Sequence, residues 1–433
     1  MTEKKSILHS NGVNYILPFI LITSCFALWG FANDITNPMV KAFSKIFRMS
    51  VTDGTLVQVA FYGGYFAMAF PAAMFIRRFS YKAGVMMGLG LYAVGAFLFY
   101  PAMLTGAYYP FLIAYFILTC GLSFLETSCN PYILSMGSED TATQRLNLAQ
   151  SFNPVGSLLG MWVAMTFIQA RLNPLESDAR ASLSDAEFEA VRDADLSILI
   201  TPYLIIGAVV LLMLVVIWMM KMPKNGDKSH DVHFLASIRR IFSLVRYREG
   251  VVAQFFYVGA QIMCWTFIIQ YGTRIFMAEG MDEKAAEVLS QKFNIIAMII
   301  FCCSRFVCTF LLRFINAGKL LATLATAAAL LTIGVMAFQD RTGIYCLVAV
   351  SACMSLMFPT IYGIALNGLG DDAKFGAAGL IMAILGGSVL PPLQARIIDC
   401  GTIFGYPAVN LSFVLPLICF IVIVIYGSRR VRN

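Results

Sequence analysis

Three ionisable side chains lie inside long apolar runs of the sequence, where charges are rare: Asp34, Glu126 and Arg305. A charge held at the depth of a bilayer costs about 2.5–3.5 kcal/mol, so such residues are functional candidates wherever the runs span a membrane. A carboxyl in a low-dielectric cavity keeps its proton to a higher pH than in water, as a reversible proton carrier requires. We therefore predict proton coupling at Glu126, with Asp34 as a second candidate. Arg305 is predicted to pair with an acid or to orient a substrate, and a purely structural ion pair is the alternative.

Amide side chains accompany these charges at helical spacing. Asn33 and Asn37 are about one turn apart, and Asp34 lies between them. Asn130 follows Glu126 by four residues, so the two side chains share a helix face. Two further groups complete the polar set: Asn147, Gln150 and Asn153, and then Tyr257, Gln261 and Trp265. Amides both donate and accept hydrogen bonds and an indole covers an apolar ring face, so the set predicts a sugar site. Hydrogen bonds between helices are the alternative.

The elements that must position these residues follow from the composition. Of 433 residues, 59% are hydrophobic and 13% are charged, whereas soluble domains have about 45–50% apolar and about 25% charged residues. An ordinary soluble enzyme is therefore excluded. The sequence contains twelve apolar runs long enough to cross a bilayer. We predict an all-α integral membrane fold with transmembrane helices at 15–40, 56–76, 83–104, 109–136, 146–170, 196–220, 251–273, 293–312, 320–338, 343–366, 375–394 and 408–426.

The distribution of basic residues predicts the orientation of these helices. Of the 31 Lys and Arg residues, 19 fall on the side of the N-terminus and 11 on the opposite side. Basic residues near helix ends are retained in the cytoplasm, so both termini are expected there. The net charge of +7 is thus a topology signal, and we expect no nucleic-acid partner.

An internal repeat is visible in the connections between helices. The basic turn at 78–82 recurs at 313–319, and the stretch from Pro131 to the next basic residue recurs after Pro359. Both recurrences have an offset of about 230–235 residues, as in transporters built from two helical halves. We predict an N-terminal six-helix half at 1–220, a cytoplasmic connector at 221–249 and a C-terminal half at 250–433.

Other residue types indicate no catalytic or metal site. The eleven cysteines include no CxxC pair, and the three histidines, His9, His230 and His233, lie outside the apolar runs. A polytopic intramembrane enzyme would need such groups at membrane depth, so it is only a distant alternative. Lys4 and Lys5 precede an apolar run without a cleavage site, which predicts an uncleaved first span.

Several stretches resemble the major facilitator superfamily, and within it the fucose permease group of sugar:proton symporters. The resemblance runs through nearly the whole chain and is most specific in GLSFLETSCNP (121–131), RLNLAQSFN (145–153), QFFYVGAQIMCW (254–265), MFPTI (357–361) and SYKAG (80–84). It implies two pseudo-symmetric halves and import of L-fucose or a related hexose with a proton. It also implies a monomer in the bacterial cytoplasmic membrane, with the proton gradient in place of a cofactor. Carriers of glucose, galactose or N-acetylhexosamines in the same family are the alternative.

The resemblance also assigns roles to individual residues. The glutamate linked to proton coupling falls on Glu126, and the sugar-site amides fall on Gln150 and Asn153. The family's aspartate in the first helix falls on Asn37, whereas the acid present is Asp34. Either Asp34 replaces it from a neighbouring face, or Glu126 alone carries the proton and Asn37 only binds sugar.

Overall fold

The computed structural model describes residues 8–10, 13–36, 39–49, 56–175, 180, 182–223, 234–403 and 405–431. The first half of the chain contains β1 (His9–Ser10), β2 (Val13–Asn14), α1 (Ile16–Thr36), α2 (Met39–Ile46), α4 (Leu56–Arg78), α5 (Tyr81–Thr105), α6 (Tyr109–Ser135), η1 (Glu139–Thr141), α7 (Ala142–Gln150), α8 (Asn153–Val163), the π-helix η2 (Ala164–Gln169) and α10 (Asp185–Met219). The second half contains α11 (Phe234–Ser243), α12 (Val245–Ala278), α13 (Glu283–Leu311), α14 (Ala317–Ala337), α15 (Arg341–Met354), α16 (Met357–Leu366), η3 (Gly370–Asp372), α17 (Ala373–Met382), η4 (Ala383–Leu385), α18 (Gly386–Ile398), β3 (Thr402–Ile403), β4 (Tyr406–Pro407), α19 (Ala408–Leu411) and α20 (Val414–Arg429).

Twelve helical stretches among the described residues are long and apolar enough to cross a membrane, which confirms the predicted number of spans. The ends of several spans differ from the prediction, and two of these differences are informative. The first span ends at Thr36, and a separate short helix, α2, follows it. The sixth begins at Asp185, because Ser184 and Glu187 form a capping box at its start.

The chain divides into two compact units. Unit 2 contains residues 14–136 and 152–233, and unit 1 contains residues 1–13, 137–151 and 234–433. The fifth span is therefore shared, since its first segment, α7, belongs to unit 1 and its second, α8, to unit 2. The predicted halves at 1–220 and 250–433 stay a prediction. Part of the predicted connector, residues 224–233, lies outside the described residues.

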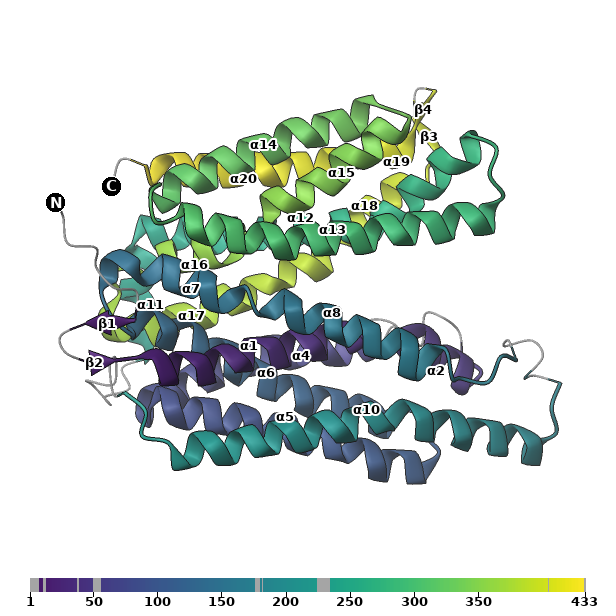
Figure 1. The fold of residues 1–433 in the computed structure, drawn as a ribbon, viewed down its shortest axis with the longest axis horizontal. Coiled ribbons are helices and arrows are strands. Elements are labelled where there is room, and N and C mark those ends of the chain that lie inside the picture. The colour runs from purple at the N-terminus through teal and green to yellow at the C-terminus, as the bar shows by residue number, and fades with distance from the viewer. Residues whose placement is uncertain are drawn as a thin grey trace. The chain divides into compact units, whose positions relative to one another are not determined.

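Unit 2 is held together by helices that approach closely. In Figure 1, α8 lies along α1, and α5 packs against both α6 and α10. The contact between α1 and α8 depends on Gly156, because a Cβ at this position would overlap the carbonyl oxygen of Ala27. Small residues allow membrane helices to associate through backbone contacts, so this position predicts tight packing of the two helices.

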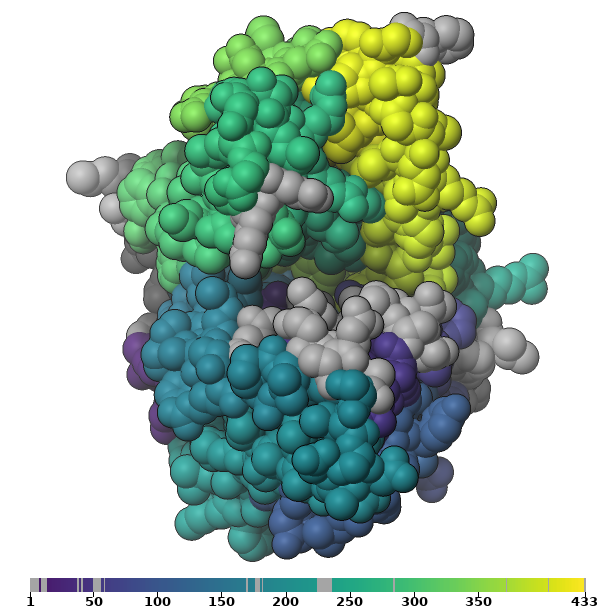
Figure 2. Space-filling model, turned by 90° about the vertical axis from the view of Figure 1, so that its right-hand side faces the viewer, coloured from purple at the N-terminus to yellow at the C-terminus, as the bar shows by residue number. Residues whose placement is uncertain are grey.

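Unit 1 repeats this arrangement. The chain's C-terminal helix α20 packs on α14, and Figure 2 shows the yellow C-terminal segment beside the green α13–α15 region. A Cβ at Gly386, at the start of α18, would overlap the carbonyl oxygen of Phe255 on α12. Gly386 follows Gly156 by 230 positions, and Phe255 follows Ala27 by 228. The same glycine-to-carbonyl contact in both units supports an internal repeat.

Candidate functional site

Glu126 is the centre of a polar cluster inside unit 2. Its side chain is 5% exposed and lies in the middle of α6. The Tyr65 hydroxyl on α4 donates to Glu126 Oε1 at 2.9 Å and lies 3.4 Å from Oδ1 of Asn33 on α1. Ser123, one turn before Glu126, donates to the Tyr65 carbonyl at 3.1 Å and so fixes α4 against α6. Three helices thus hold one carboxyl group in a defined position.

Asp34 lies close to this cluster. It is half-buried in the last turn of α1, and its charge acts on the nearby Tyr62 hydroxyl of α4. Asn33 is also half-buried. Asn37, the position at which the resemblance places an acid, lies outside the described residues. Unit 2 therefore has two carboxyl groups near the tyrosines of α4, and the hydroxyl of Tyr65 binds the carboxyl group of Glu126.

Asn130 faces its own helix more than the sequence spacing suggested. The side chain is fully buried, and its amide nitrogen donates to the backbone carbonyl of Glu126 at 2.9 Å. The next residue, Pro131, has no N–H and weakens the helical hydrogen bonds at this point. The amide of Asn130 thus reinforces the helix directly beside the carboxyl-bearing residue.

The fifth span is broken in the middle of its polar motif. α7 ends at Gln150 and α8 begins at Asn153, which Pro154 follows. The side-chain nitrogen of Asn147 donates to the Thr143 carbonyl at 2.9 Å and to the Thr360 hydroxyl at 3.1 Å, and its side-chain oxygen Oδ1 has no partner among the described residues. The three predicted amides therefore fall in two units, with Asn147 and Gln150 in unit 1 and Asn153 in unit 2.

Asn153 and Gln150 differ in their surroundings. Asn153 is half-buried, and its amide nitrogen lies 3.3 Å from the Phe26 carbonyl of α1. Gln150 is 4% exposed, and its backbone carbonyl accepts a hydrogen bond from a guanidinium. Both residues lie at the ends of helix segments, where the backbone departs from regular helix.

Arg305 on α13 supplies that guanidinium. Its Nη1 donates to the Gln150 carbonyl at 2.9 Å, and its Nε donates to the Ser355 carbonyl at 2.6 Å. In a continuous helix these two carbonyls would accept from the residues four positions later, which are Pro154 and Pro359. Because proline has no N–H, both carbonyls would otherwise lack a partner at membrane depth. Arg305 satisfies both and has no carboxylate partner among the described residues.

An aromatic pair adjoins Arg305 in unit 1. The guanidinium carbon lies 4.6 Å from the centroid of the Phe301 ring, one turn earlier on α13. The Trp265 ring meets the same phenylalanine edge-on at 4.9 Å, and its Nε1 donates to the Ser351 hydroxyl at 3.2 Å. Trp265 is only half-buried, so part of its side chain remains exposed.

The other two candidates on α12, Tyr257 and Gln261, differ in whether their polar groups are already bound to protein. The Tyr257 hydroxyl is fully buried and donates to the Met354 carbonyl at 3.1 Å, next to the break between α15 and α16. Gln261 is half-buried, and no hydrogen bond links its side chain to another described residue. Tyr257 therefore supports the backbone, while Gln261 retains a complete set of donors and acceptors for a small molecule.

Comparison with known proteins places this geometry in a family. The family model described as Major Facilitator Superfamily matches residues 22–391. The chain belongs to the major facilitator superfamily. An L-fucose-proton symporter of Haemophilus influenzae is 51% identical over 421 residues, which cover 96% of each chain. The symporter of the same name from Escherichia coli is 35% identical, with 96% of this chain and 94% of the relative covered.

Solved structures and more distant relatives agree with this family. The transporter FucP in its outward conformation aligns with a TM-score of 0.86 and 33% identity, covering 96% of this chain and 99% of that one. A protein of Brucella abortus named glucose/galactose transporter is 30% identical over 421 residues. The fucose permease group of the superfamily is therefore the group to which this sequence belongs, and the expected class of transporter rather than enzyme is confirmed.

Two residues of this major facilitator protein were missed by the sequence reasoning. Tyr65 and Phe301 each lie in an apolar run, where an aromatic side chain indicates packing first. A signal did exist for Phe301, because it precedes Arg305 by four residues and must share its helix face. No local signal identifies Tyr65, since its partners lie on α1 and α6.

Proposed function

We propose that the protein imports L-fucose together with a proton. The observation that carries this proposal is the buried Glu126 carboxyl, bound by Tyr65 inside a chain that is 51% identical to a protein named L-fucose-proton symporter. A carboxyl enclosed by three helices can bind and release a proton without leaving a fixed position. Protonation of Glu126 removes a buried charge and favours sugar binding, while release of the proton weakens it. Alternating access then exposes the site to each side of the membrane in turn.

Sugar contacts are assigned to amide and aromatic side chains. The proposed set comprises Asn33, Asn37, Asn130, Asn147, Gln150, Asn153, Tyr257, Gln261 and Trp265. Gln261 and Trp265 have the strongest support, because the side chain of Gln261 has no hydrogen-bond partner among the described residues and the side chain of Trp265 is partly exposed. Tyr257 acts in this proposal mainly by holding the break between α15 and α16 in place, and Asn130 by reinforcing α6 beside Glu126. Arg305 fixes the carbonyls of Gln150 and Ser355.

Two roles for the acid of α1 follow from the geometry. Asp34 either shares the proton with Glu126 or acts on sugar recognition through Tyr62 and Asn33. We favour the second role, because the Tyr65 hydroxyl bonds Glu126 and approaches Asn33. One proton per sugar is then carried by Glu126.

The cellular setting of the transporter is also a proposal. We place it in the bacterial cytoplasmic membrane as a monomer with both termini in the cytoplasm. The excess of basic residues on the side of the N-terminus supports this orientation. The proton gradient supplies the energy, and the sugar, the proton and the bilayer are the proposed partners.

Uptake of a panel of radiolabelled sugars into vesicles, with the external pH recorded, tests the proposal. L-Fucose should accumulate and make an unbuffered medium more alkaline, and unlabelled L-fucose should compete. The relative named glucose/galactose transporter motivates glucose and galactose as further arms, together with N-acetylglucosamine. Accumulation of one of these in place of fucose would assign the second candidate function. Uptake of fucose without alkalinisation would refute proton coupling.

A further inference from the structure

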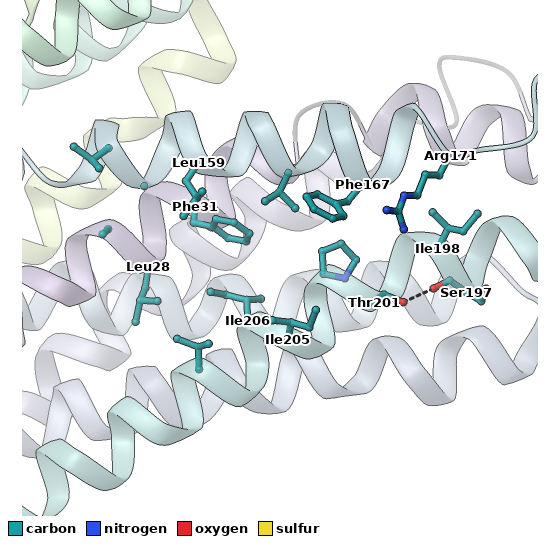
Figure 3. Close-up of a pocket in the computed structure, with 16 residues that line it drawn as sticks. Leu28, Phe31, Leu159, Phe167, Arg171, Ser197, Ile198, Thr201, Ile205 and Ile206 are labelled. Carbon is teal, nitrogen blue, oxygen red and sulfur yellow. Dashed lines mark hydrogen bonds between the residues drawn. The ribbon is translucent and has the colours of Figure 1, made fainter.

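A groove on unit 2 lies apart from the polar cluster around Glu126. It has a volume of about 600 Å³ and is bounded by α1, by α8 with the π-helix η2, and by α10. Figure 3 shows Leu28 and Phe31 of α1, Leu159 of α8 and Ile205 of α10 along its walls. The volume falls within the range of about 300–1,000 Å³ in which proteins hold small ligands. Its lining is apolar over nearly its whole length.

One end of the groove is lined by a positively charged side chain, that of Arg171. Arg171 follows the π-helix, and Figure 3 shows its guanidinium directed into the groove toward Ser197 and Thr201. It lies 5.1 Å above the Phe167 ring and has no hydrogen bond or ion pair with another described residue. The hydroxyls of Ser197 and Thr201 donate to carbonyls of their own helix at 2.9 and 2.7 Å. Arg171 therefore supplies free donors and positive charge at this end.

The groove has the length and direction of a lipid chain in one leaflet. From Val155 to Phe167 the lining helix advances twelve residues, or roughly 18 Å at the rise of a helix. Half of a bilayer's hydrocarbon core is about 15 Å thick. Arg171 follows Ile168, the last residue of the fifth span, by three positions, where the layer of lipid phosphates is expected. An apolar groove that ends in a cation at this level complements a lipid with an apolar acyl chain and an anionic headgroup.

We propose that this groove binds one acyl chain of a membrane phospholipid, with the lipid phosphate paired to Arg171. Arginine binds phosphate through paired N–H donors, which the ring of Phe167 orients. The groove also contains Ala27 and Gly156, whose backbone contact joins α1 to α8. A bound lipid therefore rests against the helix pair that carries Asn33 and Asn153, and stabilises their packing. The site is independent of the identity of the transported sugar.

Photocrosslinking in vesicles of phosphatidylethanolamine and phosphatidylglycerol tests the proposal. The full chain is reconstituted with trace phosphatidylglycerol that carries a diazirine in its acyl chain, and labelled peptides are mapped by mass spectrometry. Label should concentrate on the peptides of Leu159 and Ile205 relative to that of Ile113, which is 60% exposed on α6 outside the groove. Equal labelling at Ile113 would mean contact with bulk lipid only and would overturn the proposal.

Matched variants separate the groove from general lipid contact. Arg171→Gln should reduce groove labelling about threefold, as expected for the loss of one exposed ion pair. Arg313→Gln is the control, because Arg313 is also exposed and lies 6.0 Å above a phenylalanine ring but does not line the groove.

A second pair of variants tests the apolar part of the groove. Ile205→Trp should fill the groove and reduce its labelling, whereas Ile113→Trp should not. Free inorganic phosphate should leave labelling unchanged, and its competition would assign the site to a soluble anion. Unchanged labelling in both Arg171→Gln and Ile205→Trp would refute lipid binding.

Discussion

The hydroxyl of Tyr65 and the carboxyl of Glu126 form a hydrogen bond of 2.9 Å in the buried interior of unit 2. The tyrosine is itself held by Ser123, which bonds its backbone carbonyl. A donor fixed in this way stabilises a carboxylate more than a neutral carboxyl, because hydrogen bonds to charged acceptors are stronger. Release of the proton from Glu126 is therefore assisted by a residue that belongs to another helix.

Glu126→Gln should uncouple sugar movement from the proton. The amide cannot carry a proton but has nearly the same shape, so exchange of labelled for unlabelled sugar should persist within about threefold while accumulation disappears. Counterflow and pH-driven uptake in vesicles measure the two quantities. Glu189→Gln, at an exposed position of α10, is the matched control and should behave as wild type. Full accumulation by Glu126→Gln would remove Glu126 from the coupling role.

Tyr65→Phe should slow the step in which the proton leaves. The change removes one hydrogen bond to a charged group, worth about 1.5–3 kcal/mol, so net uptake should fall about tenfold or more. Sugar exchange needs no proton release and should change far less. Tyr203→Phe is the control, since Tyr203 is equally buried in unit 2 and its hydroxyl lies 2.7 Å from that of Tyr115. A parallel loss in both assays would indicate a purely structural role for Tyr65.

Arg305→Lys should destabilise unit 1 although the charge is kept. Lysine has no planar fork with which to reach the carbonyls of both Gln150 and Ser355. Loss of one of these bonds should cost about 1.5–3 kcal/mol, seen as a lower melting temperature in detergent. Arg313→Lys, at an exposed position two residues after the end of α13, should leave the melting temperature unchanged. An unaffected Arg305→Lys would mean that the two carbonyls find other partners.

The apolar runs predicted the twelve spans because each helix must cover the same thickness of hydrocarbon. The sequence also indicates that two backbone carbonyls need a donor from outside their own helix, which is one part of the contact made by Arg305. Pro154 and Pro359 each stand four residues after a carbonyl that a continuous helix would bond. What no local pattern contains is the identity of the cation that reaches both carbonyls, since this depends on the packing of three separate spans.

Side-chain direction limited the prediction of the polar site. The spacing of Glu126 and Asn130 places both on one helix face, yet the amide of Asn130 turns back to the Glu126 carbonyl. The spacing of two residues determines the helix face on which their side chains lie, but it does not determine the rotamers of those side chains. Tyr65 shows the converse case, because its hydroxyl gains a role only when α4 is placed against α6.

Gly156→Ala should disrupt the contact of α1 with α8. The added methyl overlaps the Ala27 carbonyl, and overpacking of this kind costs about 1–3 kcal/mol. Gly90→Ala on α5 is the matched control, because its Cβ would meet only Leu214 Cδ1 at 3.6 Å, an ordinary contact. There alanine should be neutral or slightly stabilising through its higher helix propensity. Thermal unfolding in detergent and the yield of folded protein measure the difference, and equal behaviour would contradict the packing argument.

Gln261→Ala should weaken sugar binding without destabilising the protein. Its half-buried amide has no bond to another described residue, so its removal leaves no protein group unpaired. If the amide binds a sugar hydroxyl, the KM should rise about five- to tenfold, the effect of one neutral hydrogen bond of about 1 kcal/mol or slightly more. Gln394→Ala provides the contrast, because the fully buried Gln394 donates to the Ser412 hydroxyl at 3.0 Å. That variant should lower the melting temperature and leave the KM nearly unchanged. A normal KM for Gln261→Ala would exclude it from the sugar site, and a lower melting temperature would show that it packs against protein instead.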